Sequence, residues 1–294
     1  MKSGFVAILG RPNVGKSTLL NAIINKKVSI VTDKAQTTRN NIKGIYHGDD
    51  LQIVFVDTPG IHKPLQKLGQ EMNVMAYSAA HDVDVSVLVI DASKKFGDGD
   101  QYLIDHLDIH KTPLIIVFNK IDLARINEVQ ELKNKYLEIF PDSPQVEIVA
   151  KDRFNLLELV NKISFFLPEG PEYYPLEVIS DKDEIFQIKE IIREKVLKEL
   201  RQEVPHSIAI YMEDISWDEN PLKIKAVIVV EKESQKGIVI GKNGQQIKAI
   251  GSKSRRDIEK LLGKHIYLEL FVKVEEDWRD NENLLKKFGY TKEQ

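Results

Sequence analysis

The sequence predicts a doubly wound α/β domain with a mostly parallel sheet, followed by a smaller α+β domain. Short apolar runs alternate with longer helical patterns through residues 4–167, as in sheets whose successive strands are joined by helices. A stretch rich in proline interrupts this pattern at residues 168–175, and a different order of elements follows it. We therefore expect a first domain over residues 1–167, a linker over 168–180 and a second domain over 181–294.

The strands expected in the first domain are continuous apolar runs, which is typical of strands buried on both faces. They cover Phe5–Leu9, Gln52–Val56, Val85–Ile90, Leu114–Phe118 and Val146–Val149. Between them, Gln101–His110 and Glu128–Phe140 have the length and spacing of helices. Ligands of such sheets bind outside the carboxyl ends of the strands, so the residues that follow each run are candidates for a site.

The second domain is expected to begin with one long amphipathic helix that ends near Gln202. Its apolar residues recur at helical spacing at Ile185, Ile188, Ile192 and Val196. The runs Ser207–Tyr211 and Lys223–Val230 then predict two strands. A glycine-bearing loop, two helical stretches and a final strand at Ile266–Val272 complete the domain.

Composition excludes several classes of protein. Apolar residues make up 42% of the 294 residues and charged residues 30%, and the net charge is −3, as in a soluble protein with two cores. The chain has no cysteine, which excludes disulfides, thiolate catalysis and cysteine-based metal sites. It has no secretory signal and no apolar run near the ~18–20 residues that span a bilayer. We expect a cytoplasmic monomer whose membrane association is at most peripheral, on the inner face of the cell membrane.

The first motif is a phosphate loop of the form G-x-x-x-x-G-K-[ST], which follows an expected strand and opens a helix. It reads Gly10-Arg11-Pro12-Asn13-Val14-Gly15-Lys16-Ser17. Its backbone N–H groups and the helix N-terminus should surround the phosphates, Lys16 should reach the β- and γ-phosphates, and the Ser17 hydroxyl should bind Mg²⁺. Thr18 continues the motif into the helix. An ordinary glycine turn is the weaker interpretation, because strand, loop and helix are all in register.

A second motif, Asp57-Thr58-Pro59-Gly60, ends the next central strand. The Asp57 carboxylate can support Mg²⁺, usually through water, and Gly60 can offer a backbone N–H to the γ-phosphate. Between the two motifs lies Gln36-Thr37-Thr38-Arg39, where a threonine can bind Mg²⁺ and sense the γ-phosphate. We expect Lys16, Thr38 and Gly60 to act in catalysis and Ser17, Thr38 and Asp57 to hold Mg²⁺. The expected phosphate contacts are Gly10, Arg11, Pro12, Asn13, Val14, Gly15, Lys16, Ser17, Thr18, Asp57, Thr58, Pro59 and Gly60.

The motif Asn119-Lys120-Ile121-Asp122 follows the strand Leu114–Phe118 and favours guanine. The Asp122 carboxylate can accept from guanine N1–H and the exocyclic amine, whereas adenine presents a lone pair there. Asn119 can donate to the purine or brace the phosphate loop, and the Lys120 stem can lie along the ring. A backbone N–H from Ala150 can donate to guanine O6.

These motifs, in this order, resemble the Era family of translation-factor-like GTPases, and the resemblance covers about residues 4–290. It implies a P-loop GTPase domain in which Thr38 is the Mg²⁺-sensing threonine, with Thr37 as the second choice. It also implies that Asn13 helps to hold a monovalent cation, often K⁺. Relatives usually carry Ser-Ala-Lys in the last guanine loop; here Val149 replaces the serine, which should loosen the bracing of the loop.

Catalysis should be slow. Ile61 stands where Ras-like proteins place a water-orienting glutamine, and it cannot orient water by hydrogen bonding. Hydrolysis should therefore depend on Lys16, Mg²⁺, backbone donors and a cation that supplies charge in the manner of an arginine finger.

The second domain carries a GXXG loop between two expected helices, which resembles the type II KH arrangement. The loop is Gly241-Lys242-Asn243-Gly244, and segment 236–264 holds eight basic residues against two acidic ones. This combination is the expected footprint of an RNA backbone. The expected RNA contacts are Gly241, Lys242, Asn243, Gly244, Lys248, Lys253, Arg255 and Arg256. The apolar residues Ile238, Val239, Ile240, Ile247 and Ile250 should line a groove for unstacked bases.

The Era resemblance implies a specific partner, the 3′ end of small-subunit ribosomal RNA, and a role in the assembly of the small ribosomal subunit. Two other interpretations remain open from the sequence. One is an RNA-binding adaptor whose GTP site is structural and does not hydrolyse. The other is a P-loop small-molecule kinase, against which Asn119 and Asp122 argue. Trp278, Phe288 and Tyr290 are expected to be packing anchors rather than base-stacking groups.

Overall fold

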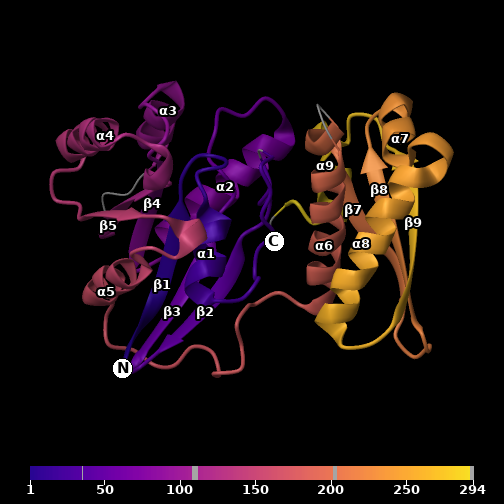
Figure 1. Cartoon of the computed structure of the whole chain (residues 1–294), viewed down its shortest axis with the longest axis horizontal. Helices are drawn as coiled ribbons and strands as arrows, with labels where there is room; N and C mark the ends of the chain where they lie inside the picture. The colour runs from indigo at the N-terminus through magenta and orange to yellow at the C-terminus, as the bar shows by residue number, and fades with distance from the viewer. Residues whose placement is uncertain (35, 108–111, 201–203, 292–294) are drawn as a thin grey trace. The chain divides into compact units, whose positions relative to one another are not determined.

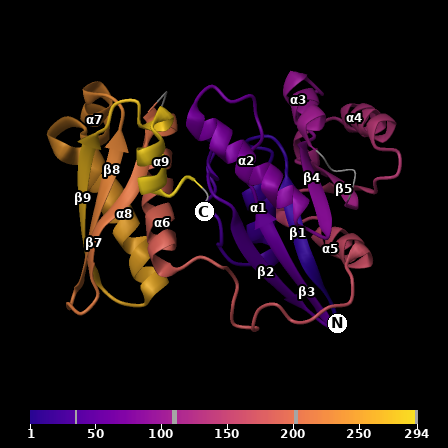
Figure 2. The same ribbon diagram turned by 180° about the vertical axis from the view of Figure 1, so that it is seen from behind.

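The computed structural model describes residues 1–34, 36–107, 112–200 and 204–291. The chain divides near Asp181 into two compact units, each with a sheet of its own (Figures 1 and 2). None of the helices in these described ranges combines the length and the apolar character needed to cross a membrane.

The first unit is built on a six-stranded sheet in the order β2-β3-β1-β4-β5-β6. Neighbouring strands are parallel except for the pair β2 and β3. The strands are β1 (Lys2–Leu9), β2 (Ile42–Gly48), β3 (Leu51–Asp57), β4 (Val85–Asp91), β5 (Leu114–Asn119) and β6 (Gln145–Ile148). Central strands such as β4 and β5 are buried along almost their whole length, because helices cover both faces of the sheet.

Two apolar cores lie on opposite faces of this sheet. One core joins the sheet to α1 (Lys16–Ile24) and α5 (Leu156–Phe166). The other joins it to α2 (Lys67–His81), α3 (Asp98–His106) and α4 (Ile126–Ile139), and Figure 1 shows these helices flanking the strands. The expected doubly wound fold is confirmed. The helix expected over Gln101–His110 instead covers Asp98–His106, with Leu107 extended after it; residues 108–110 lie outside the described ranges.

The proline-rich stretch runs along the first unit as an anchored segment. The Ser3 N–H donates to Pro168 O, and the Gly170 N–H donates to Met1 O. Further on, the Gln52 side chain accepts from the Tyr173 N–H and donates to Tyr174 O. These bonds fix the path of the chain as it leaves the first unit.

The second unit has a three-stranded sheet in the order β7-β8-β9, with β7 antiparallel and β9 parallel to the central strand. Its elements are α6 (Glu184–Glu199), β7 (Ala209–Ser216), β8 (Leu222–Val230), α7 (Glu233–Ile240), α8 (Gln245–Leu262), β9 (Ile266–Val274) and α9 (Glu282–Phe288). The helix–strand–strand–helix–helix–strand order is the expected KH arrangement. The expected end of the first helix at Gln202 lies outside the described residues. Trp278, Phe288 and Tyr290 are buried, which confirms them as packing anchors.

Candidate functional site

The predicted phosphate loop joins β1 to α1, and two of its glycines are required by close approach. Gly15 has a φ of +102°, and a Cβ there would lie 2.3 Å from the Asn119 side-chain nitrogen. Gly10 has a φ of +146°, and its Cβ would lie 2.5 Å from Val89 O. The loop therefore passes directly over the ends of β4 and β5, where side chains would not fit.

Lys16 lies buried under this loop. Its Nζ donates to Gly10 O at 3.1 Å and to Arg11 O at 3.0 Å. Burial lowers the pKa of Lys16 to about 8, although the Asp57 carboxylate opposes the shift. A buried ammonium whose partners are mostly neutral carbonyls is well prepared to receive an anion.

The three expected Mg²⁺ residues come together at the foot of the loop. Ser17 Oγ lies 2.7 Å from Thr38 Oγ1 and donates to Asp57 Oδ2 at 2.7 Å, and Thr38 Oγ1 lies 3.4 Å from the same carboxylate oxygen. Ser29, which the sequence did not single out, also donates to Asp57 Oδ2 at 2.9 Å. The threonine whose hydroxyl reaches this cluster is Thr38, which favours it over its neighbour as the Mg²⁺ ligand.

Asp57 has the character of a metal-supporting carboxylate. Its Oδ1 is buried and has no hydrogen-bond partner among the described residues. Burial raises the pKa of Asp57, although Lys16 and the hydroxyl donors Ser17, Ser29 and Thr38 oppose the shift. A buried carboxylate oxygen left unpaired among hydroxyl oxygens fits Mg²⁺, which prefers oxygen ligands.

The segment Asp57–Gly60 packs directly against the phosphate loop. A Cβ on Gly60 would lie 2.6 Å from Pro12 N, and the N–H of Ile61 donates to Gly10 O at 3.2 Å. The Thr58 hydroxyl donates to Ile8 O instead of facing the loop, so this side chain secures the strand end. Ile61 is fully buried in the core beneath α2 and α3, in agreement with its expected inability to orient water.

His62 is a residue to which the sequence assigned no role. Its Nδ1 lies 2.9 Å from Gly60 O and its Nε2 lies 3.0 Å from the Gln36 side-chain nitrogen. Asn73 of α2 holds its backbone by accepting from the His62 N–H and donating to the His62 carbonyl. His62 thus links the Gln36–Arg39 loop to the Asp57–Gly60 segment. The sequence feature that could have identified His62 is its position two residues after the second motif.

The predicted base motif braces the phosphate loop at two consecutive carbonyls. Asn119 Nδ2 donates to Val14 O at 2.9 Å, and Lys120 Nζ donates to Asn13 O at 2.7 Å. Asn119 Oδ1 accepts the Ala150 N–H at 3.0 Å. A contact from Ala150 to guanine O6 would therefore share this N–H with Asn119. Asp122 is exposed and can meet a base at the surface.

The Arg11 side chain pairs with a carboxylate of α3, while its expected phosphate contact stays a prediction. Its Nη1 donates to Asp100 Oδ2 at 2.8 Å, and a Cβ on Gly99 would lie 2.7 Å from the guanidinium carbon. Asp100 also accepts from the Gly97 N–H and from the Tyr136 hydroxyl. Arg11 therefore ties the loop to the start of α3.

In the second unit, the GXXG loop lies between α7 and α8 as expected. Gly241, Asn243 and Gly244 all have positive φ angles, and Lys242 and Asn243 are exposed. The loop therefore presents a compact turn with its lysine in solvent at the N-terminus of α8. A nucleic-acid backbone can approach such a turn closely.

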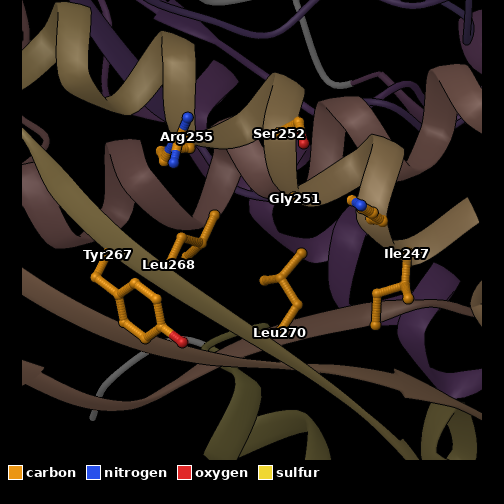
Figure 3. Close-up of a pocket in the computed structure, with 8 residues that line it drawn as sticks. Ile247, Gly251, Ser252, Arg255, Tyr267, Leu268 and Leu270 are labelled. Carbon is orange, nitrogen blue, oxygen red and sulfur yellow. The ribbon is translucent and has the colours of Figure 1, made fainter. Parts of the chain in front are cut away.

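A pocket of about 300 Å³ lies along this loop's helix. As Figure 3 shows, one wall comes from α8 and the other from β9. Its lining residues are Ile247, Lys248, Gly251, Ser252, Arg255, Tyr267, Leu268 and Leu270. The pocket is apolar at its centre and carries basic side chains on the helix side, a combination that suits a base and its phosphate.

For this groove the expected RNA contact of Lys253 stays a prediction, and the expected apolar lining is corrected. Lys253 forms an ion pair with Glu199 of α6, because it projects from a different face of α8 than Lys248 and Arg255 do. Val239 and Ile250 are fully buried core residues, and among the five apolar residues expected in the groove, only Ile247 lines the pocket.

Comparison with known proteins agrees with both units. A family model described as 50S ribosome-binding GTPase matches residues 5–120, and a KH domain model matches residues 203–279. A crystal structure of an Aquifex aeolicus Era variant bound to GDP·AlF4⁻ is 40% identical, with a TM-score of 0.94, over 99% of this chain and 100% of that chain.

A second structure, Era in complex with MgGDPNP and nucleotides 1506–1542 of 16S ribosomal RNA, is 39% identical, with a TM-score of 0.95. It covers 99% of this chain and 100% of that chain. Similarity at this level over the whole length, together with the two matched domains, means that the chain belongs to the Era family of GTPases.

Proposed function

We propose that this protein is a GTP-hydrolysing switch that binds the 3′ end of small-subunit ribosomal RNA and acts in small-subunit assembly. The observation that carries the GTPase part is the convergence of Ser17, Thr38 and Asp57 beside the buried Lys16. The two Era structures, one with a transition-state mimic and one with MgGDPNP and 16S ribosomal RNA, support the same reaction and partner.

In this mechanism Lys16 and the loop N–H groups hold the phosphates, and Gly60 offers its N–H to the γ-phosphate. Ser17, Thr38 and Asp57 would hold Mg²⁺, which supplies charge stabilisation for the developing negative charge. Thr38 joins the Gln36–Arg39 loop to this group, so loss of the γ-phosphate would release the loop. Asp122 selects guanine, and Asn119 keeps the loop in place.

The decisive experiment is phosphate release under single-turnover conditions with Mg²⁺ and GTP or ATP. We expect phosphate release from GTP and not from ATP. The Thr38→Ala variant should lose roughly 10²-fold in rate, while the matched Thr37→Ala variant should change little. Asp122→Asn should weaken GTP binding by roughly 10²-fold or more and favour xanthosine triphosphate, whose base carries an oxygen in place of the exocyclic amine. Tight GTP binding without phosphate release would instead support the RNA-binding adaptor.

We also propose that K⁺ assists hydrolysis at Asn13. Asn13 lies at the top of the loop with a φ of +63°, and Lys120 fixes its carbonyl. Turnover should be faster in K⁺ than in Na⁺, and Asn13→Ala should abolish the difference. Equal rates in the two salts would remove K⁺ from the mechanism.

For RNA we propose that the α8–β9 pocket takes an unpaired base while Lys248 and Arg255 meet the adjacent phosphates. Lys248→Ala and Arg255→Ala should each weaken binding of a 16S ribosomal RNA 3′-end oligonucleotide and reduce the salt slope by about 1. Lys253→Ala is the matched control on the same helix, because Lys253 is paired with Glu199. An equal loss in all three variants would indicate a diffuse electrostatic contact.

A further inference from the structure

Lys120 of the base motif forms an ion pair with Asp91, a carboxylate that belongs to none of the motifs. Lys120 Nζ lies 2.6 Å from Asp91 Oδ2 while it donates to Asn13 O at 2.7 Å. Asp91 is the last residue of β4 and lies beside Asn119 in the parallel register of β4 and β5. The carboxylate therefore reaches the lysine from the neighbouring strand end.

Asp91 is itself held in one orientation. Its Oδ1 accepts the Ser93 N–H at 3.1 Å and the Ser93 hydroxyl at 2.6 Å, and its side chain is only 12% exposed. Burial alone would raise the pKa of Asp91, but the bonds from Lys120 and Ser93 lower it below its ordinary value. The carboxylate is thus a fixed negative charge with one oxygen directed at Lys120.

We propose that Asp91 is a positioning residue for the guanine nucleotide. It holds the Lys120 ammonium over the Asn13 carbonyl, which keeps the lysine stem extended beside the base site and ties the phosphate loop to that site. This inference rests on the proposed guanine-binding role of Lys120. The side chain of Asp91 is bonded to Lys120 and Ser93, neither of which belongs to the Mg²⁺ group, so its loss should change how long nucleotide stays bound.

The test is the dissociation rate of fluorescent GDP from Asp91→Ala and from the isosteric Asp91→Asn. Loss of a charge-assisted bond of this kind should speed GDP release about 10-fold. Asp105→Ala, which removes an exposed carboxylate of α3, is the matched control and should release GDP at the parent rate. If neither Asp91 variant speeds release, the inference is wrong.

A double-mutant cycle separates positioning from general stability. In a Lys120→Ala background, Asp91→Ala should add less than about a twofold change, because its partner is already gone. Full additivity would mean that Asp91 acts on the fold and not through Lys120, and would overturn the inference. If Lys120→Ala itself leaves GDP release unchanged, the proposed guanine site fails; if Lys120→Ala speeds release and Asp91→Ala does not, only the positioning role of Asp91 fails.

Discussion

At the scale of single residues, Gly60 shows how tightly the two phosphate motifs fit together. A Cβ there would lie 2.6 Å from Pro12 N and 2.7 Å from Pro12 Cα, both backbone atoms that cannot swing aside. Gly97, by contrast, has extended backbone, and a Cβ added to it would have nothing within 4 Å. The two glycines therefore form a matched pair for substitution.

We predict that Gly60→Ala lowers single-turnover GTP hydrolysis by roughly 10²-fold, because the displaced N–H no longer meets the γ-phosphate. GDP affinity should change little, since GDP has no γ-phosphate. Gly97→Ala should retain the parent hydrolysis rate. Parent-like hydrolysis in Gly60→Ala would show that the close packing against Pro12 is not maintained during turnover.

The sequence predicts residue types at the site better than it predicts side-chain directions. Spacing predicted that Lys16, Ser17 and Asp57 would lie close together, as they do, because a strand–loop–helix leaves few alternatives for them. Lys253 was assigned to RNA by its charge and Arg11 to the phosphates by its place in the loop motif, yet each side chain has an acidic partner from a distant part of the chain. No local pattern announces such a partner, because the pairing exists only once the helices are packed.

At the scale of elements, the missed strand β2 has a specific cause. Its run contains glycines, and a Cβ on Gly44 would lie 2.7 Å from Leu20 Cδ1 of α1. Close packing of α1 against the strand therefore requires the residue that weakens a strand prediction. The short helix α9 was also missed; it has seven residues, and its Asn281 cap accepts from the N–H groups of Asn283 and Leu284. The strand β2 therefore depends on packing against α1, whereas α9 is too short for a clear periodic pattern.

Helix α8 contains Gly251 at a position where alanine would make the helix more stable. A Cβ on Gly251 would meet only Leu270 Cδ1, at an ordinary 3.6 Å, and alanine is favoured over glycine inside a helix by about 0.8–1 kcal/mol. Yet Gly251 lines the α8–β9 pocket, where an added methyl group would take up space.

We therefore predict that Gly251→Ala raises the free energy of unfolding by up to about 1 kcal/mol while it weakens RNA binding. Urea unfolding and titration with the 16S ribosomal RNA oligonucleotide would measure the two effects on one protein. Stronger or unchanged RNA binding would mean that bases do not enter the pocket at Gly251.

At the scale of the whole molecule, each compact unit has a sheet of its own. The order of the motifs predicted the order of these units, because each motif requires a defined strand-to-helix context. The proline-rich stretch was expected as a linker from composition alone; its bonds to Ser3 and Gln52 could not be read from sequence because they join residues more than 120 positions apart.

We predict two calorimetric transitions, of which GDP shifts only one. A ligand that binds one folded unit stabilises it by about 2.7 kcal/mol at 100 times its Kd, or roughly 5–10 °C for a domain of this size. The RNA oligonucleotide should shift the other transition. A single transition that moves as a whole with GDP would show that the two units unfold together.

The burial of Ile61 also limits how the pace of this switch can be changed. The side chain is enclosed by apolar neighbours, so a glutamine introduced there would sit in hydrocarbon at a cost of about 1–3 kcal/mol and would face away from the reacting water. We therefore expect that Ile61→Gln would not speed GTP hydrolysis. Position 61 therefore contributes to the packing of the domain and not to the alignment of water.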